Sequence, residues 1–196
     1  MKITIASTLL PIAAVLTLGA ATASAQPTPV NVNMSFSGNG GATAIDLKQP
    51  NSNNVEENVA GNGTLGQFTF RDIRAAATSP EASSTCSGVF FPTVAGGGVL
   101  RFQDGSLLKV KIEQGSGSGD CIDLVHMMAH CTLILEIIKG GTGRFQNASG
   151  VLTYAETATP VLFDSLGNVV LGTETGGIAG TISGVGREED RQAQPQ

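Results

Sequence analysis

The chain has 196 residues and a formal net charge of −5 at pH 7. This length suits a single domain, and the weakly acidic composition without a basic stripe argues against binding to nucleic acid or to anionic membranes. Only 14% of the residues are charged and 26 are glycine, which together favour an all-β fold with many tight turns.

Residues 1–25 have the layout of a secretory signal peptide. Lys2 supplies the positive start, Ile3–Leu18 is almost entirely apolar, and Ala23–Ala25 offers the small residues that a signal peptidase reads. The apolar run is shorter than the roughly 20 residues that a membrane-spanning helix needs. We therefore expect a secreted or periplasmic protein, with a mature chain from about Gln26 that has no membrane span.

Strand signals recur along the first half of the mature chain. Apolar residues alternate with polar ones at the two-residue period of a half-buried strand from Val30 to Phe36, and the glycines of residues 38–41 predict its end. Residues 64–73 predict a second strand, with Gly66 at a bulge. Residues 49–54 and 75–87 have the composition of loops.

The second half begins with the clearest hairpin in the sequence. Asp104-Gly105 is a strong turn signal, and in residues 108–113 three apolar side chains alternate with three charged ones. Gly115–Gly119 predicts a flexible connection, and residues 132–138 a strand that is apolar on both faces. Further strands are expected at 151–159, 161–163, 169–173 and 178–182, with a hairpin loop at 164–168.

These short strands with turn residues between them favour a meander barrel or a sandwich. We predict an antiparallel up-and-down barrel of about eight strands, because closure would hide the strand edges of a protein with so few charges. The expected organisation is a signal peptide at 1–25, a barrel domain at 26–186 and a disordered tail at 187–196.

The three cysteines are Cys86, Cys121 and Cys131, and an odd count leaves one unpaired. In an exported protein a disulfide is the default expectation. We favour the pair Cys121–Cys131 because the two residues are close in sequence, while Cys86 with either partner stays open.

The segment Lys139–Gly150, KGGTGRFQNASG, resembles the strand-turn-strand signature of the allene oxide cyclase and dirigent barrels, and is most similar to a group of uncharacterised bacterial exported proteins. The glycines Gly140, Gly141 and Gly143 would allow a sharp turn, Phe145 would plug the barrel end, and Arg144 would extend outward. The resemblance implies an eight-stranded barrel with a central cavity, which in these families can hold an apolar oxylipin or guide phenoxy radicals. It does not transfer catalytic residues to this chain.

Candidate site residues are few. Glu136 lies in an apolar strand, and an inward carboxyl there would have a raised pKa and could act as an acid or base. Asp123 is a similar candidate, and Tyr154 could donate a hydrogen bond to a ligand in the cavity. His126 and His130 have a spacing seen in zinc sites, but the segment between them lacks the glutamate of that motif. We therefore expect no metal and no cofactor.

Because no catalytic constellation is visible, our first hypothesis is a non-catalytic exported barrel that binds a small apolar ligand. A cyclase or isomerase of the allene oxide cyclase type is the second, and a surface adhesion or assembly module is the third. The sequence leaves a homo-oligomer open.

Overall fold

A computed structural model describes residues 28–165 and 169–186. Its elements, in chain order, are β1 (Val30–Ala42), β2 (Ser52–Gly63), β3 (Phe68–Ala77), β4 (Val89–Phe102), β5 (Leu107–Ile112), β6 (Gly115–Asp123), β7 (Met128–Ile137), the short 3-10 helix η1 (Gly143–Phe145), β8 (Ser149–Phe163) and β9 (Val169–Ser183).

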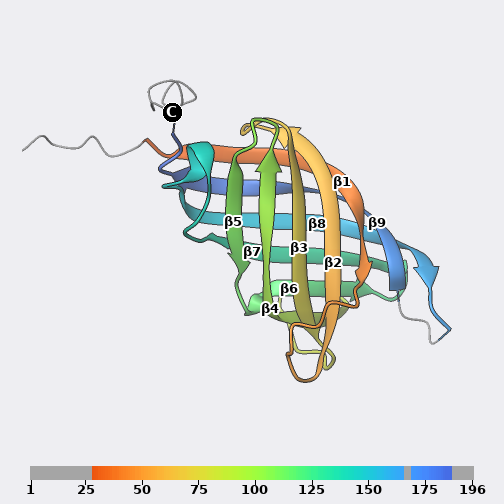
Figure 1. Ribbon diagram of the computed structural model, residues 1–196. Coiled ribbons are helices and arrows are strands. Elements are labelled where there is room, and N and C mark those ends of the chain that lie inside the picture. Colours follow the sequence, from red (N-terminus) through yellow and green to blue (C-terminus); the bar gives the residue numbers. More distant parts are fainter. Residues whose placement is uncertain (1–27, 166–168, 187–196) are drawn as a thin grey trace, which may run out of the picture.

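The sheet closes on itself, because the strand order β3-β2-β1-β9-β8-β7-β5-β4-β6 is completed by pairings of β3 with β4 and of β7 with β6. β5 and β6 each pair with β4 on one side and with β7 on the other. They pair with different parts of these two strands. The result is an eight-stranded antiparallel barrel in meander order with one extra strand, as the sequence predicts (Figure 1).

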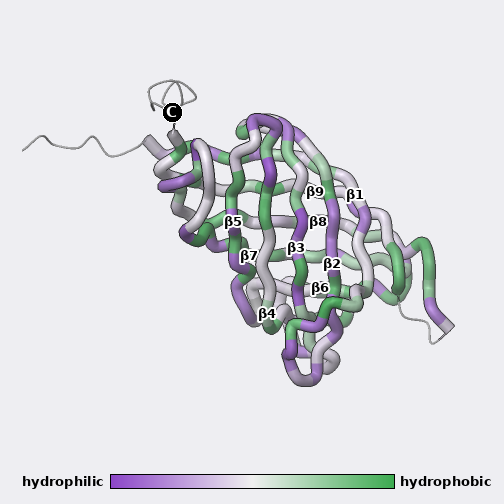
Figure 2. Tube along the Cα trace, viewed as in Figure 1, coloured by the Kyte–Doolittle hydropathy of each residue, from purple (hydrophilic) through white to green (hydrophobic). Residues whose placement is uncertain are grey.

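Alternation along each strand separates a packed interior from a polar exterior. In β5 the side chains of Leu108, Val110 and Ile112 are buried, whereas Lys111 is exposed. The same alternation occurs in the first part of β3, where Phe68 and Phe70 are buried and Thr69 and Arg71 are exposed, and Figure 2 shows hydrophilic and hydrophobic stretches following one another along this strand. The buried apolar side chains form one cluster around the barrel interior, and each large one contributes about 1.5–3 kcal/mol through burial.

The glycine-rich turn before η1 closes one end of the barrel. Gly140 and Gly143 have φ values of 97° and 59°, which side chains rarely adopt. This turn lets Phe145 enter the core, where its ring centroid lies 4.6 Å from that of Phe102. Phe145 is thus buried at this end of the barrel.

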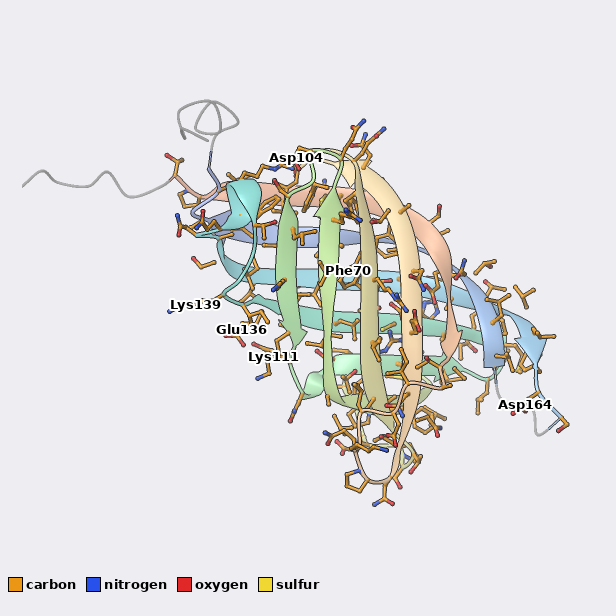
Figure 3. All side chains as sticks on the ribbon, in the orientation of Figure 1. Phe70, Asp104, Lys111, Glu136, Lys139 and Asp164 are labelled. Atoms are coloured by element: carbon orange, nitrogen blue, oxygen red, sulfur yellow. A yellow bond between two sulfur atoms is a disulfide. The ribbon has the colours of Figure 1, made fainter. Side chains whose placement is uncertain are left out.

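Arg144 does not extend outward as expected. Its guanidinium lies 4.9 Å and 4.7 Å from the ring centroids of Phe102 and Phe145. It also donates to the Leu65 carbonyl at 2.5 Å and lies 3.3 Å from the carboxylate of Asp104, which Figure 3 labels at this end. Two aromatic faces, the Leu65 carbonyl and the charge of Asp104 hold the side chain over the barrel end.

Several predicted boundaries are wrong, because the ladders of a closed barrel override local glycine and proline signals. β1 continues through residues 38–41, where it pairs with β2 or β9 on its two sides. The predicted flexible connection Gly115–Gly119 is part of β6. β8 passes through Pro160 with a register shift directly after it, and Gly66 lies in the turn between β2 and β3 instead of at a bulge.

The predicted disulfide is also wrong: the bond joins Cys86 to Cys121, and Cys131 is a free, buried thiol. The register between β6 and β7 explains why Cys121 does not pair with Cys131. Cys121 lies opposite the exposed His130, whereas Cys131 lies opposite Asp120, whose side chain lines the interior. Side chains of directly paired residues share a face of the sheet, so Cys121 and Cys131 point to opposite faces.

The predicted signal peptide, the predicted tail at 187–196 and residues 166–168 of the hairpin loop lie outside the described residues. Within the described part of the chain, no helix has the length and apolar character needed to cross a membrane.

We expect the Cys86→Ser/Cys121→Ser variant to lose about 2–4 kcal/mol of unfolding free energy, because the bond closes a loop of 35 residues. Chemical denaturation measures this loss, and peptide mapping without reductant identifies the bond. Cys131→Ala is the control and should retain the 86–121 cross-linked peptide. Recovery of a 121–131 peptide from the unmodified protein would contradict the assignment.

Candidate functional site

The end of the barrel opposite η1 contains a pocket of about 600 Å³. Its walls include small and apolar side chains, among them Ala76, Phe91, Ile122 and Ala158. The β8–β9 hairpin lies beside its mouth, since Pro160 and the residues near it contribute to the lining. The volume is within the range of about 300–1,000 Å³ found for small-molecule sites.

The base of the pocket is polar, because six strands direct ionisable side chains inward at nearly the same level. Register defines the arrangement: Glu57 of β2 lies opposite Asp72 of β3, and Asp120 of β6 lies opposite Cys131 of β7, which lies opposite Glu156 of β8. The remaining members are Arg74 of β3 and Glu174 of β9, both buried. Together these seven residues form the acid cluster.

Arg74 is the centre of the acid cluster. Its Nη1 donates to Oε1 of Glu57 and lies 3.6 Å from Oδ2 of Asp72, and its Nη2 donates to Oδ1 of Asp120 at 3.0 Å. The Arg74, Glu57 and Asp72 side chains are at most 4% exposed. A buried charge is costly unless it is paired, and this one guanidinium serves three carboxylates.

An aromatic layer separates the acid cluster from the hydrocarbon core, which lies between this layer and the end closed by η1. The ring of Tyr154 stacks on Phe36 at 4.7 Å between centroids and lies 5.6 Å from Phe70, which Figure 3 labels near the middle of the barrel. The Tyr154 hydroxyl donates to Oε2 of Glu156 at 2.5 Å. Tyr154 therefore presents its apolar ring to the core and its one polar atom to the cluster.

Gly40 provides the room that Glu174 occupies. A Cβ at residue 40 would overlap Oε1 of Glu174 and lie 2.8 Å from Cγ of Glu57. Since Gly40 lies opposite both Glu57 and Gly172 in the ladders, the bare backbone of β1 forms the wall against which the two carboxyl groups rest. Any larger residue would displace one of them.

Several pKa values in the cluster are raised. Burial, reinforced by the charge of Glu57, raises the pKa of Glu156 to about 10 and that of Glu174 to about 8. The same two causes raise the pKa of Asp72, and burial raises the pKa values of Cys131 and Tyr154. Hence several acids of the cluster carry protons at neutral pH, because one arginine cannot balance all of them.

Of the three candidates from the sequence, only Tyr154 contacts the acid cluster, through its hydrogen bond to Glu156, and it does not line the pocket itself. Glu136 is exposed on the outer face of β7, opposite Lys111, and Figure 3 shows both away from the barrel interior. Asp123 lies at the end of β6, where it accepts backbone hydrogen bonds from Val125 and His126 and contacts the His126 ring. Hydrogen bonds from His126 lower the pKa of Asp123 to about 2.

The sequence analysis missed the acidic members of the cluster. Glu57 lies in a polar segment that contains no clear strand signal, although Val55, Glu57 and Val59 do share one face. Glu156 and Glu174 lie in strands rich in threonine, alanine and glycine, where a glutamate has the pattern of a solvent-facing residue. Tyr154 and Glu156 are two residues apart in one strand and so share a face. This spacing is the signal that could have identified Glu156 as an inward-facing residue.

Three donors could in principle hold a metal ion, since one ligand atom each of Glu57, Cys131 and Glu156 lie within 4.8 Å of one another. Two features disfavour this use. A thiol must ionise to bind a metal, and burial raises the pKa of Cys131. In addition, Oε1 of Glu57 already accepts a hydrogen bond from Nη1 of Arg74.

No protein-family model, curated protein or solved structure matches this chain. The twelve-residue segment Lys139–Gly150 therefore remains a resemblance, and it lies at the barrel end opposite the pocket. Conclusions about function rest on the geometry of the pocket and of the acid cluster.

The raised pKa values give a pH dependence of stability with a definite sign. Between about pH 5 and pH 8 the folded protein holds protons on Glu156 and Glu174 that the unfolded chain, with glutamate pKa values near 4.5, has released. The unfolding free energy should therefore fall as pH rises, by about 1.4 kcal/mol per pH unit for each extra proton.

Denaturation at several pH values measures this slope. We expect Glu156→Gln/Glu174→Gln to flatten it, because a glutamine does not titrate, and we expect the exposed Glu136→Gln to leave it unchanged. A stability that does not change with pH across this window would show that these acids are ionised in the folded state as well.

Proposed function

We propose that this protein is an exported barrel that binds a small molecule with an apolar body in the pocket at its open end. The observation that carries the proposal is the acid cluster at the base of that pocket. Burying so many carboxyl groups lowers stability, and clusters of perturbed ionisable groups in a concave site are typical of functional sites.

The shape of the barrel supports a ligand that enters from one side. The far end is filled by Phe102 and Phe145 and covered by Arg144, and the hydrocarbon core fills the middle. Among the residues that the structure describes, the room for a ligand lies at the pocket end of the interior, between the aromatic layer and the mouth beside Pro160.

The export part of the proposal rests on the N-terminal sequence pattern and on the Cys86–Cys121 bond, which fits an oxidising compartment. N-terminal sequencing of the mature protein from the periplasm or medium would give a start near Gln26 if the signal peptide is cleaved as proposed.

We expect the purified protein to bind 1-octanol, a probe with an apolar chain and one hydroxyl group, and Ala158→Phe to weaken this binding at least tenfold. Ala158 lines the pocket, so a phenyl ring there would occupy the mouth. Ala155→Phe is the matched control, since it places the same ring on the exposed face of the same strand. Isothermal titration calorimetry measures both, and equal affinities in the two variants would rule out this pocket.

A second candidate is an isomerase or cyclase of the allene oxide cyclase type, and one contact favours it. Glu156, with its pKa raised to about 10, keeps a proton at neutral pH in a site with apolar walls, and Tyr154 fixes its carboxyl group. Such an acid could protonate the oxygen of an unsaturated epoxide as the ring opens.

For this candidate we expect turnover of an unsaturated fatty-acid epoxide that Glu156→Gln lowers at least 100-fold, because the amide cannot donate the same proton. Product analysis by chromatography measures the rate, with Glu136→Gln as the control. A rate no higher than that in buffer would remove the enzymatic candidate and leave the binding proposal intact.

An adhesion or assembly role would use a different surface. The outer part of the β8–β9 hairpin exposes apolar side chains, including Val161, Leu162 and Phe163, each at least 43% exposed. Figure 2 shows this ribbon as a hydrophobic stretch that projects from the barrel, and Asp164 marks its end in Figure 3. Exposed apolar ribbons favour contact with another protein, such as a second copy of the chain. Ligand binding in the pocket does not depend on such a contact.

A further inference from the structure

The charges that line the pocket are unequal in number. Among the described lining residues, five carry a carboxyl group and one carries a guanidinium. The five carboxyl groups belong to Glu57, Asp120, Glu156, Asp164 and Glu174, and the guanidinium to Arg74. The pocket therefore has a strong excess of groups that can become negative.

One carboxylate oxygen in this set has no hydrogen-bond partner. Oε2 of Glu174 is buried and has no donor, and Glu174 lines the pocket and is 3% exposed. Buried acceptors in native proteins nearly always have donors. This oxygen therefore indicates a missing donor group that enters from the cavity.

We propose that the ligand carries a protonated primary amine, which binds between Glu57, Glu156 and Glu174 while its alkyl chain packs along Phe91 and Ala158. This proposal names the ligand class and rests on the binding function proposed above. An ammonium group fits because it offers three N–H donors and one positive charge, which matches the unpartnered Glu174 oxygen in a site with excess carboxyl groups.

The same geometry disfavours an anionic ligand. The guanidinium of Arg74 already donates through Nη1 to Glu57 and through Nη2 to Asp120. Its Nε has no partner, but a carboxylate ligand that reached it would lie among the acidic side chains of the cluster. In a buried site, the repulsion between this carboxylate and its acidic neighbours exceeds the stabilisation from one more hydrogen bond.

Binding of the ammonium should release protons. In the free protein some carboxyl groups of the cluster are protonated, because they face one another and only one arginine. The groups that face Glu174 and Glu156 come from every adjoining inward position, namely Glu57, Asp72, Arg74, Asp120, Cys131 and Tyr154. When the ammonium takes its place, a carboxyl group loses its proton to solvent and becomes the carboxylate that binds the cation.

This exchange sets the pH dependence of affinity. As pH falls from 8 to 5, protons compete with the ammonium for the carboxylates and affinity should decrease. Above about pH 10 the free amine itself loses its charge, so affinity should decrease again. A neutral ligand of the same length should show neither decrease.

The experiment compares three probes with the same eight-carbon chain: n-octylammonium, 1-octanol and octanoate. Each is titrated into the full mature protein at pH 8 by isothermal titration calorimetry, in two buffers with different ionisation enthalpies so that released protons are counted. We expect n-octylammonium to bind at least tenfold more tightly than 1-octanol and octanoate to bind most weakly, with net proton release for the ammonium alone.

Two variants locate the site. We expect Glu174→Gln and Glu156→Gln each to weaken n-octylammonium at least tenfold and to change 1-octanol less than threefold, while the exposed Glu136→Gln changes neither. Because glutamine is neutral and similar in shape, these variants should fold, and circular dichroism verifies this.

The outcomes separate the two proposals. If 1-octanol binds as tightly as n-octylammonium, or if no proton is released, the ammonium proposal is wrong and the binding function stands. If none of the three probes binds the wild-type protein, the binding function itself is wrong, and the ammonium proposal is lost with it.

Discussion

The half of the barrel that contains the pocket depends on the ion pairs of the Arg74 guanidinium. It contacts carboxylates of β2, β3 and β6 and so joins strands from two sides of the interior. Removing either partner of a buried ion pair typically costs about 3–5 kcal/mol, because an unpaired charge is left behind. A purely apolar interior would hold these strands at least as well, so stability alone does not account for the cluster.

The two ends of the barrel solve the same physical problem in different ways. At the closed end, Arg144 lies over two aromatic rings and is balanced by Asp104. At the open end, Arg74 faces more carboxyl groups than it can balance, and raised pKa values follow. A balanced charge produces a stable cap, and an unbalanced cluster produces a site ready to accept a cation or to give up a proton.

Tyr154 connects the cluster to the core. Its ring belongs to the aromatic layer with Phe36 and Phe70, and its hydroxyl belongs to the cluster through Glu156. The position of Glu156 is thus set by the packing of the core below it. Gly40 helps to fix the position of Glu174, because glycine has no side chain and leaves the space in which Glu174 lies. Both residues fix the cluster without being part of any recognisable motif.

The sequence by itself determined the all-β class, the Asp104-Gly105 hairpin and the alternation in residues 108–113, because each depends on contacts close in sequence or on a strict two-residue period. Only the tertiary structure decided the disulfide partner and the site. Cys121 and Cys131 are ten residues apart but face opposite sides of the sheet. The acid cluster assembles from positions 57 to 174, and only strand register after closure of the barrel brings those carboxyl groups to one level.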